Sequence, residues 1–314
     1  MDEGWVACDK RQPCKLCGDT HKWCCHGLRY NLCHRVESAR PCPGSGCGWL
    51  HPIEAESGIA PAVLPPRAKR IPDAALDARF APLAQAAHRA GQSRLPELAR
   101  QLGVAVRALQ ALHVGWGEID ERWAWTFPER NAAGLVTGIA LRLENPTRAG
   151  KTKLCAKGSR RGLCYAPGWM LGSGVVAIVE GGSDVAAAYT LGLSAIGRPS
   201  NTGGLPMIAA ILKRYAPQRQ VIVIGENDKK PPLYVSQLNP PHDPRCQACN
   251  RCHPGRFGAE ETARRLEARI VYPPLPHKDL RAWLNAQGLA LSDIAGCLER
   301  GATLRKGFFP RTIT

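Results

Sequence analysis

Short apolar runs of strand length alternate with helix-like segments in the second half of the chain. The runs are rich in Val, Ile and Ala and are bounded by turn residues, which is typical of buried strands. Strands are expected near 175–179, 194–196, 221–224 and 269–272, and helices over 183–192, 205–214, 259–268 and 278–286. Strands that alternate with helices in this way build parallel sheets. The pattern therefore predicts an α/β fold here.

The preceding region has two different patterns. Leucines recur at helical intervals on both sides of Gly103, so residues 76–113 are expected to be helical. This segment is similar to a helix-turn-helix, but we favour an ordinary helix pair that packs on its neighbours, because such patterns are common in cores. Residues 114–144 alternate as strands do, with a turn at 131–134.

Carboxylates follow two of the predicted strands. Glu180 ends the first strand, with Asp184 four residues later, and Glu226 and Asp228 follow the strand at 221–224. The carboxyl ends of parallel strands are where open α/β sheets place their chemistry. Carboxylate oxygens suit a hard cation such as Mg²⁺, with Mn²⁺ as a substitute, which binds phosphate substrates. An acidic pair at a helix start would explain Asp184 alone, but not a glutamate at the end of a buried strand.

The charge balance narrows the class of partner. The chain of 314 residues has 42 Lys and Arg against 26 Asp and Glu, for a net charge of +16. Such an excess favours a polyanion, most often nucleic acid. No long apolar run and no basic amphipathic helix supports a membrane partner. The acidic first residues lack a signal core, so we expect a cytoplasmic protein.

Eleven of the fourteen cysteines are concentrated in two places. Eight lie between Cys8 and Cys47, and in a chain without a signal peptide their close spacing indicates metal binding rather than disulfides. The Cys14-x-x-Cys17-Gly turn is a zinc knuckle, and Cys33 with either Cys24 or Cys25 would complete four thiolates. We take Cys24. Cys8, Cys42 and Cys47 could form a second site with His34 or His51, or remain free thiols.

Cys246, Cys249 and Cys252 form the second concentration, with His242 and His253 nearby. Zinc with a histidine as fourth ligand is our leading interpretation. An iron–sulfur cluster is the alternative, since close cysteine runs also hold those clusters, and a loop with unliganded thiols is the third reading.

The acidic motifs resemble those of the TOPRIM fold, which is shared by bacterial DNA primases, type IA and type II topoisomerases and some nucleases. The pattern is a strand ending in Glu-Gly and a later strand ending in Asp-x-Asp, matched here by Glu180-Gly181 and by Glu226-x-Asp228. Glu226 replaces the first Asp. The Gly258-Ala259 helix and the Lys278-Asp279 segment also match, which makes Asp279 a further candidate acid.

A zinc ribbon ahead of TOPRIM narrows the resemblance to DNA primases of the bacterial and phage type. It implies a Rossmann-like TOPRIM catalytic domain, a small N-terminal zinc ribbon and a mixed α+β region between them. The boundaries expected are a ribbon at 1–52, a basic Pro-rich linker at 53–75, a helical segment at 76–113, a basic mixed-strand subdomain at 114–170, TOPRIM at 171–290 with a Cys-containing insertion at 230–257, and a tail at 291–314.

The resemblance implies RNA primer synthesis on single-stranded DNA in DNA replication, by Mg²⁺-dependent nucleotidyl transfer from ribonucleoside triphosphates. Glu226 and Asp228 would hold the metal, Glu180 would bind metal or relay a proton, and Asp184 would support it. A replicative helicase supplied by another chain is a candidate partner. Template and nucleotide contacts are expected from cations before and beside the acidic site, namely Lys151, Lys153, Lys157, Arg160, Arg161 and Arg198.

In the ribbon, Trp23 or Arg29 could contact the template, although Trp23 more simply packs over the zinc knuckle. Two rival functions stay open at this point. A TOPRIM nuclease would use the same carboxylates to activate water. A catalytically dead, zinc-containing DNA-binding protein would explain the Glu226 departure.

Overall fold

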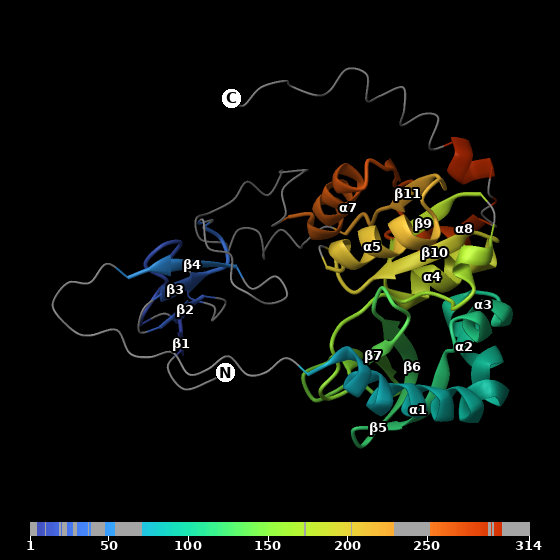
Figure 1. Ribbon diagram of the computed structural model, residues 1–314, viewed down its shortest axis with the longest axis horizontal. Coiled ribbons are helices and arrows are strands. Elements are labelled where there is room, and N and C mark those ends of the chain that lie inside the picture. Colours follow the sequence, from blue (N-terminus) through green and yellow to red (C-terminus); the bar gives the residue numbers. More distant parts are fainter. Residues whose placement is uncertain are drawn as a thin grey trace. The chain divides into compact units, whose positions relative to one another are not determined.

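The computed structural model divides the chain into two compact units, each described here by itself (Figure 1). The structure describes residues 5–9, 11–18, 20, 24–27, 30–36, 38, 48–53, 71–172, 174–201, 203–228, 252–287, 290 and 292–296. The described residues of the smaller, N-terminal unit end at Ile53, and those of the larger unit begin at Ile71.

The N-terminal unit is a small antiparallel sheet built around cysteines. Its strands follow the sheet order β1-β2-β3-β4 and span Val6–Ala7 (β1), Cys25–His26 (β2), Tyr30–Cys33 (β3) and Trp49–Pro52 (β4). The side chains buried in its described part are five cysteines and Asn31. So small a buried apolar area supplies little hydrophobic free energy. The cysteines must therefore stabilise this unit by something other than apolar packing.

The larger unit begins with helices. They are α1 (Asp73–Gly91), the 3₁₀ turn η1 (Gln92–Arg94), α2 (Leu95–Leu102) and α3 (Val106–Ala111). Helix α1 starts within the stretch expected as linker, at Asp73 directly after Pro72, because proline readily precedes or opens a helix. The leucines of α2 and α3 are buried in a core that also includes Ala177, Val179 and Ile222. The pair therefore packs as an ordinary helix pair.

An antiparallel sheet follows, as the alternating pattern predicted. Its strands are β5 (Gly115–Ile119), β6 (Arg122–Arg130), β7 (Val136–Leu143) and β8 (Lys153–Cys155), in sequence order. Alternate residues point to opposite faces. Ala124, Ile139 and Leu141 pack against α1, while Phe127, Ala140 and Arg142 point to the other face and line a cavity.

The second sheet is parallel, in the order β10-β9-β11-β12. The expected strands and helices are present, with ends that differ by a few residues. They are β9 (Val176–Glu180), α4 (Gly181–Thr190), β10 (Ser194–Arg198), α5 (Leu205–Tyr215), β11 (Val221–Ile224), α7 (Pro254–Arg265), β12 (Arg269–Val271) and α8 (Leu280–Gln287), and η2 (Trp169–Leu171) precedes them. The α/β class with a parallel sheet is confirmed.

Helices cover both faces of this sheet, and the core lies in two layers. Ala177 and Val179 of β9 share one buried cluster with α4 and α8, whereas Val176 and Ile178 share the other with α5 and α7. Strand β9 is therefore buried on both sides, which explains its unbroken apolar sequence. Because β9 and β11 are hydrogen-bonded neighbours, with Val176 opposite Val221, their carboxyl ends meet at one edge.

Candidate active site and cysteine cluster

The chain turns sharply at the end of β9, and two glycines make the turn possible. Glu180 is the last strand residue and caps α4. Gly181 has a φ of +73°, a left-handed conformation that suits glycine. A Cβ on Gly182 would lie 2.5 Å from Cδ1 of Phe127. The Glu-Gly-Gly sequence thus lets α4 start against β6 and fixes Glu180 at the sheet edge.

Three carboxylates from separate elements meet at this edge. Asp184 lies in the first turn of α4, Glu226 follows β11 and Asp279 precedes α8, and one oxygen from each lies within 4.8 Å of the others. Asp184 is buried and its Oδ1 accepts the backbone N–H of Arg281 (3.1 Å). Asp279 thus joins Asp184 and Glu226 in one group, which we call the acidic triad.

Asp228 and Glu180 stand outside the acidic triad. Asp228 Oδ1 accepts the backbone N–H of Gly255 at 2.7 Å. Glu180 Oε2 is buried, lies 3.8 Å from Nη2 of Arg198 and has no hydrogen-bond partner among the described residues. A buried oxygen without a partner costs about 1–3 kcal/mol, so it indicates a group that binds there from outside the chain.

Burial dominates the electrostatics of these carboxylates, and repulsion between them adds to it. Burial, followed by the nearby Glu180, raises the pKa of Glu226 to about 7, although Lys278 opposes the shift. Burial and then Asp279 and Glu226 raise the pKa of Asp184 well above its usual range. Burial also raises the pKa of Glu180, while Arg198 lowers it. Each shift means that the folded site disfavours a negative charge on that carboxylate.

The donor set therefore fits a divalent cation. Carboxylate oxygens are the ligands that Mg²⁺ and Mn²⁺ prefer, and a dication would relieve the repulsion between the carboxylates. The group of oxygens within metal-binding reach is the acidic triad, and it includes Glu226 despite the longer arm of glutamate.

The triad opens into a cavity of 500 Å³ between the two sheets of the larger unit. Glu180 and all three triad members are in its wall. The cavity is lined by six cationic residues: Arg142, Lys153, Arg161, Arg198, Lys278 and Arg281. A wall with this many cations beside a metal-binding edge is suited to a polyphosphate ligand.

Of the six basic residues predicted to bind nucleic acid or nucleotide, three line this cavity and three do not. Lys153, Arg161 and Arg198 line the cavity. Arg198 is 1% exposed and donates from Nη1 to Gly258 O and Thr262 Oγ1 (both 2.9 Å). These bonds fix its guanidinium beside Glu180.

The other three lie outside that wall. Arg160 contacts Asp73 and the carbonyl of Ile71. Lys151 and Lys157 are exposed.

Sequence reasoning missed several cavity residues. Glu129 is buried, and both its oxygens accept the Nε–H of Arg161 (3.0 and 2.9 Å). Burial raises the pKa of Glu129 even though Arg161 lowers it. Arg142 lies opposite Lys153 in the sheet, and Arg281 faces Asp184. Strand alternation in β7 could have placed Arg142 on the face of the sheet away from α1. It does not reveal which other element that face meets.

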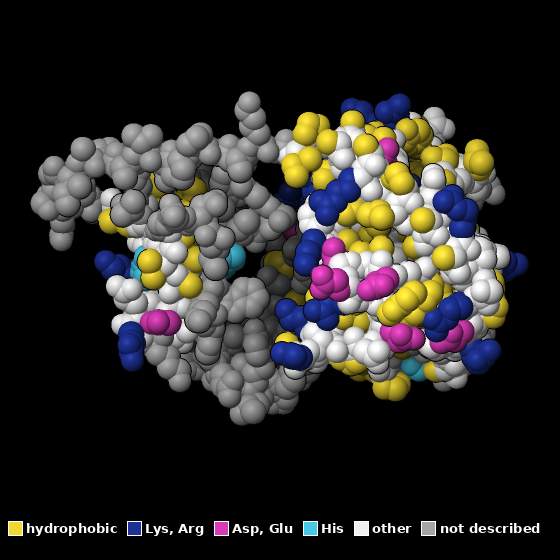
Figure 2. Space-filling model, turned by 90° about the horizontal axis from the view of Figure 1, so that it is seen from below, with side chains coloured by type: hydrophobic (Ala, Val, Ile, Leu, Met, Phe, Trp, Pro, Cys, Tyr) yellow, Lys and Arg dark blue, Asp and Glu magenta, His cyan; other side chains and the backbone are white. Residues whose placement is uncertain are grey.

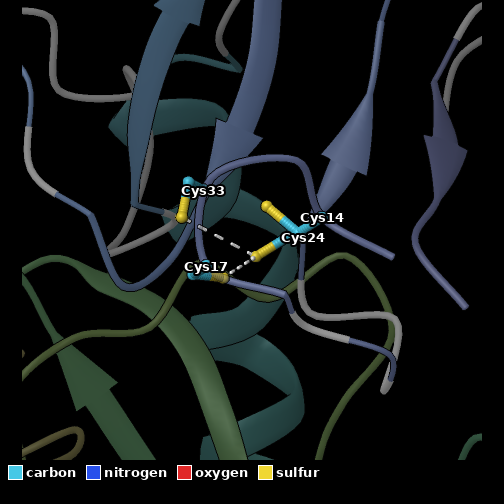
Figure 3. Close-up of side chains that lie close together, drawn as sticks. All are labelled: Cys14, Cys17, Cys24 and Cys33. Carbon is cyan, nitrogen blue, oxygen red and sulfur yellow. Dashed lines mark hydrogen bonds between the residues drawn. The ribbon is translucent and has the colours of Figure 1, made fainter. Parts of the chain in front are cut away.

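In the N-terminal unit, four cysteines converge (Figure 3). Sulfur atoms of Cys14, Cys17, Cys24 and Cys33 lie within 4.8 Å of one another, with Cys17 and Cys24 at 3.6 Å. Gly18, with a φ of +70°, donates its N–H to the carbonyl of Cys14 (2.8 Å), which closes the knuckle turn. The group contains Cys24 and not Cys25.

This cysteine cluster fits a zinc ion. Backbone N–H groups of His34 and Val36 donate to the sulfurs of Cys24 and Cys33 (3.5 and 3.2 Å), as thiolates require. Burial raises the pKa of Cys24, as do neighbouring thiolates, whereas for Cys14 the backbone N–H bonds from Cys17 and Leu16 outweigh burial and lower the pKa. Four soft sulfur donors without room for water are typical of structural zinc.

Most of the other residues predicted to bind metal or template lie outside the part of the chain that the structure describes. Cys246, Cys249, His242, Cys42, Cys47, Trp23 and Arg29 lie outside the described residues. Cys252 is described and buried. His51 Nε2 contacts the carbonyl of Val36 (3.0 Å) rather than a cysteine. Among the described helices, none is long and apolar enough to cross a membrane.

Comparison with known proteins finds similarity in solved structures. No family model and no curated protein matches the chain. The zinc-binding and RNA polymerase domains of the Aquifex aeolicus primase are 12% identical to it, with a TM-score of 0.50 over 74% of this chain and 62% of that one. A DnaG catalytic core is 14% identical (TM-score 0.49, 72% of this chain and 79% of that one). A Pseudomonas aeruginosa primase domain is 13% identical (TM-score 0.47, 70% and 78%).

The chain therefore has the fold of the zinc-binding and RNA polymerase domains of a DNA primase. The fold resemblance stated from the sequence motifs is confirmed by this match. At 12% identity the likeness concerns the fold alone, so activity has to be argued from the site.

Proposed function

We propose that this protein is a DNA primase, which synthesises short RNA primers on single-stranded DNA during replication. The observation that carries the proposal is the acidic triad, set beside Glu180 at the meeting edge of β9 and β11 and opening into a cation-lined cavity. This is the donor arrangement that nucleotidyl transfer needs: carboxylates for a divalent cation and cations for the triphosphate.

Metal and nucleotide would be held by different residues. Asp184, Glu226 and Asp279 would hold Mg²⁺ or Mn²⁺, with Asp228 held nearby by Gly255 as the fourth carboxylate of the predicted site. When bound, the dication supplies charge neutralisation at the transferring phosphoryl group. We assign zinc to the cysteine cluster as a structural ion.

We propose that Glu180 accepts the proton of the attacking 3′-hydroxyl. Its Oε2 is buried and unpartnered, and its raised pKa brings it nearer to neutral pH, where a general base works best. Arg198 keeps the carboxylate in place from 3.8 Å.

Arg161 and Lys153 would bind the triphosphate. Glu129 holds the guanidinium of Arg161 through the Nε–H and Nη2 of the arginine, and Nη2 also donates to the carbonyl of Pro199. The side chain is therefore fixed before a ligand binds and would lose little entropy on contacting the triphosphate through Nη1. Lys153 is exposed on the cavity wall. We propose Lys151 and Lys157 as contacts for the template backbone, which carries one negative charge per nucleotide and would bind in a salt-dependent manner.

The distribution of surface charge supports DNA binding at a particular site rather than over the whole surface. Figure 2 shows Lys and Arg side chains standing beside Asp and Glu on the visible face of the larger unit. That face therefore carries no patch of a single sign, and the net charge of +16 does not by itself indicate where DNA binds.

The test is incorporation of labelled ribonucleotides on single-stranded DNA with Mg²⁺ or Mn²⁺. Wild type should make short oligomers, Glu180→Gln should make none, and Glu261→Gln should match wild type, because Glu261 lies on α7 and pairs with Arg264 and Arg265 outside the cavity. Template cleavage that depends on Glu180 would establish a nuclease instead. DNA binding with neither reaction, and no response to added helicase, would indicate a binding protein.

A further inference from the structure

A second cavity of 390 Å³ lies on the opposite face of the antiparallel sheet from the first. Its wall combines α1 from Asp77 to Arg89, the end of β6 and His113, which lies two residues after the end of α3. The polar and charged members of this wall are Asp77, Gln85, His88, Arg89, His113 and Arg130. Arg130 lines this cavity, whereas Glu129, its neighbour on β6, lines the first.

Arginines outnumber acids in the wall of this cavity, with Arg89 and Arg130 against Asp77. Asp77 is the single acid in the described wall, and its Oδ1 already accepts the backbone N–H of Val136 (2.7 Å). Arg130 has a buried Nε–H without a hydrogen-bond partner among the described residues. Leaving such a donor unpaired costs about 1–3 kcal/mol, so its presence indicates a ligand that accepts hydrogen bonds.

His113 occupies a position where glycine would be less strained. Helices α2 and α3 end in the same way, with a left-handed residue followed by a backbone bond that closes the last turn: Val104 N to Ala99 O and Val114 N to Leu109 O (both 3.0 Å). In α2 the left-handed residue is Gly103 (φ +64°), whereas in α3 it is His113 (φ +54°).

A residue with a side chain in this left-handed conformation lowers the free energy of unfolding by roughly 1 kcal/mol relative to glycine. The imidazole of His113 stacks on His88 at 5.0 Å and stands at the cavity rim. It therefore provides a polar group at this place that glycine could not. Burial, with His88 and Arg130 after it, lowers the pKa of His113, as expected where positive charge accumulates.

We propose that this cavity is a binding site for a phosphate-class anion, held by Arg130 and His113 with Arg89 at the rim. The site is separate from the carboxylate centre and does not depend on the proposed polymerase activity. The anion could belong to a free phosphate or nucleotide, or to the backbone of a nucleic acid.

The experiment follows the imidazole NMR signals of His113 and His88 in the whole protein during titration with inorganic phosphate, against sodium chloride of matched ionic strength. Phosphate should shift both signals in a saturable way and raise the pH at which His113 titrates. His113→Gly should fold at least as stably as wild type yet show no shift of His88. Arg130→Gln should weaken phosphate binding at least tenfold, and Arg161→Ala, in the first cavity, should leave it unchanged.

The source of the anion is read from the same signals. Saturation by phosphate or a nucleotide at lower concentration than by a single-stranded oligonucleotide assigns the site to a mobile anion, and the reverse order assigns it to nucleic acid. Equal shifts with chloride, no shift with either probe, or unchanged phosphate binding in both His113→Gly and Arg130→Gln would overturn the proposal.

Discussion

The cysteine cluster and the acidic triad both bring like-charged ligands together, but they stand in opposite surroundings. The N-terminal unit buries little besides its cysteines, whereas β9 beside the triad is buried in apolar layers on both faces. In the first case the ligands must hold the fold together. In the second the fold holds the ligands against their mutual repulsion. The comparison teaches that a metal at the cysteine cluster would stabilise structure, whereas a metal at the acidic triad would serve chemistry.

The largest expected effect is loss of the N-terminal fold. Cys17→Ser removes one of the four sulfurs, so the zinc bound by the cysteine cluster should fall from one ion per chain to none. The NMR signals of residues 5–53 should then lose their chemical-shift dispersion, while those of the larger unit keep theirs. A structural zinc contributes about 10–16 kcal/mol in small domains. Zinc analysis and NMR spectra measure both outcomes. Cys25→Ser, outside the cluster, is the matched control, and full zinc in Cys17→Ser would refute the assignment.

The second effect concerns the turn that presents Glu180. Gly182→Ala would place a methyl group 2.5 Å from the ring of Phe127 and 3.1 Å from the sulfur of Cys164. We expect a loss of about 2–3 kcal/mol in the free energy of unfolding, as for other overpacked sites, together with impaired primer synthesis. Gly168→Ala meets no atom closer than 3.8 Å and should be nearly neutral. Denaturant unfolding measures both, and equal values would show that the close approach is unimportant.

The acidic triad should make stability depend on pH in a direction opposite to that of ion-paired acids. The pKa of Glu226 is raised from 4.5 to about 7, so between these values the folded state keeps a proton that the unfolded chain has lost. The free energy of unfolding of the larger unit should therefore fall, by about 1–3 kcal/mol, as pH rises from 4.5 to 7.

Mg²⁺ should reduce this fall, because it replaces the proton as counter-charge. Thermal unfolding at several pH values, with and without Mg²⁺, measures both effects. A stability that rises through this pH range would contradict the account of the site.

The smallest effect is expected at Lys278. Its Nζ lies 3.7 Å from Glu226 Oε2, but its side chain is 59% exposed. Solvent screens such a pair, so Lys278→Met should change the stability of the metal-free protein by less than about 1 kcal/mol. A larger loss in calorimetry would mean that Lys278, rather than the fold, restrains the acidic group.

The sequence predicted what local pattern can determine. Apolar runs placed β9 and β11, and with them Glu180 and Glu226 at a common edge. The grouping of Asp184 with Asp279 was not predicted, because it depends on how α4 and α8 pack.

The roles of the basic residues were harder still. Arg198 was predicted to contact nucleic acid or nucleotide because it follows a strand beside the acidic site, and it lines the cavity, but its side chain is buried and lies 3.8 Å from Glu180. Glu129 and Arg142 were missed because sheet register and the opposing sheet, rather than neighbours in sequence, bring them into the cavity.

The most direct test of the central claim is one measurement on Glu226→Gln, primer synthesis on single-stranded DNA with Mg²⁺. The substitution removes a buried repulsive charge, so the variant should unfold no more easily than wild type at pH 8, and its zinc content should be unchanged. The account predicts that this well-folded variant makes at least a hundredfold less primer. Primer synthesis close to the wild-type rate would contradict it, because the chemistry would then not depend on the acidic triad.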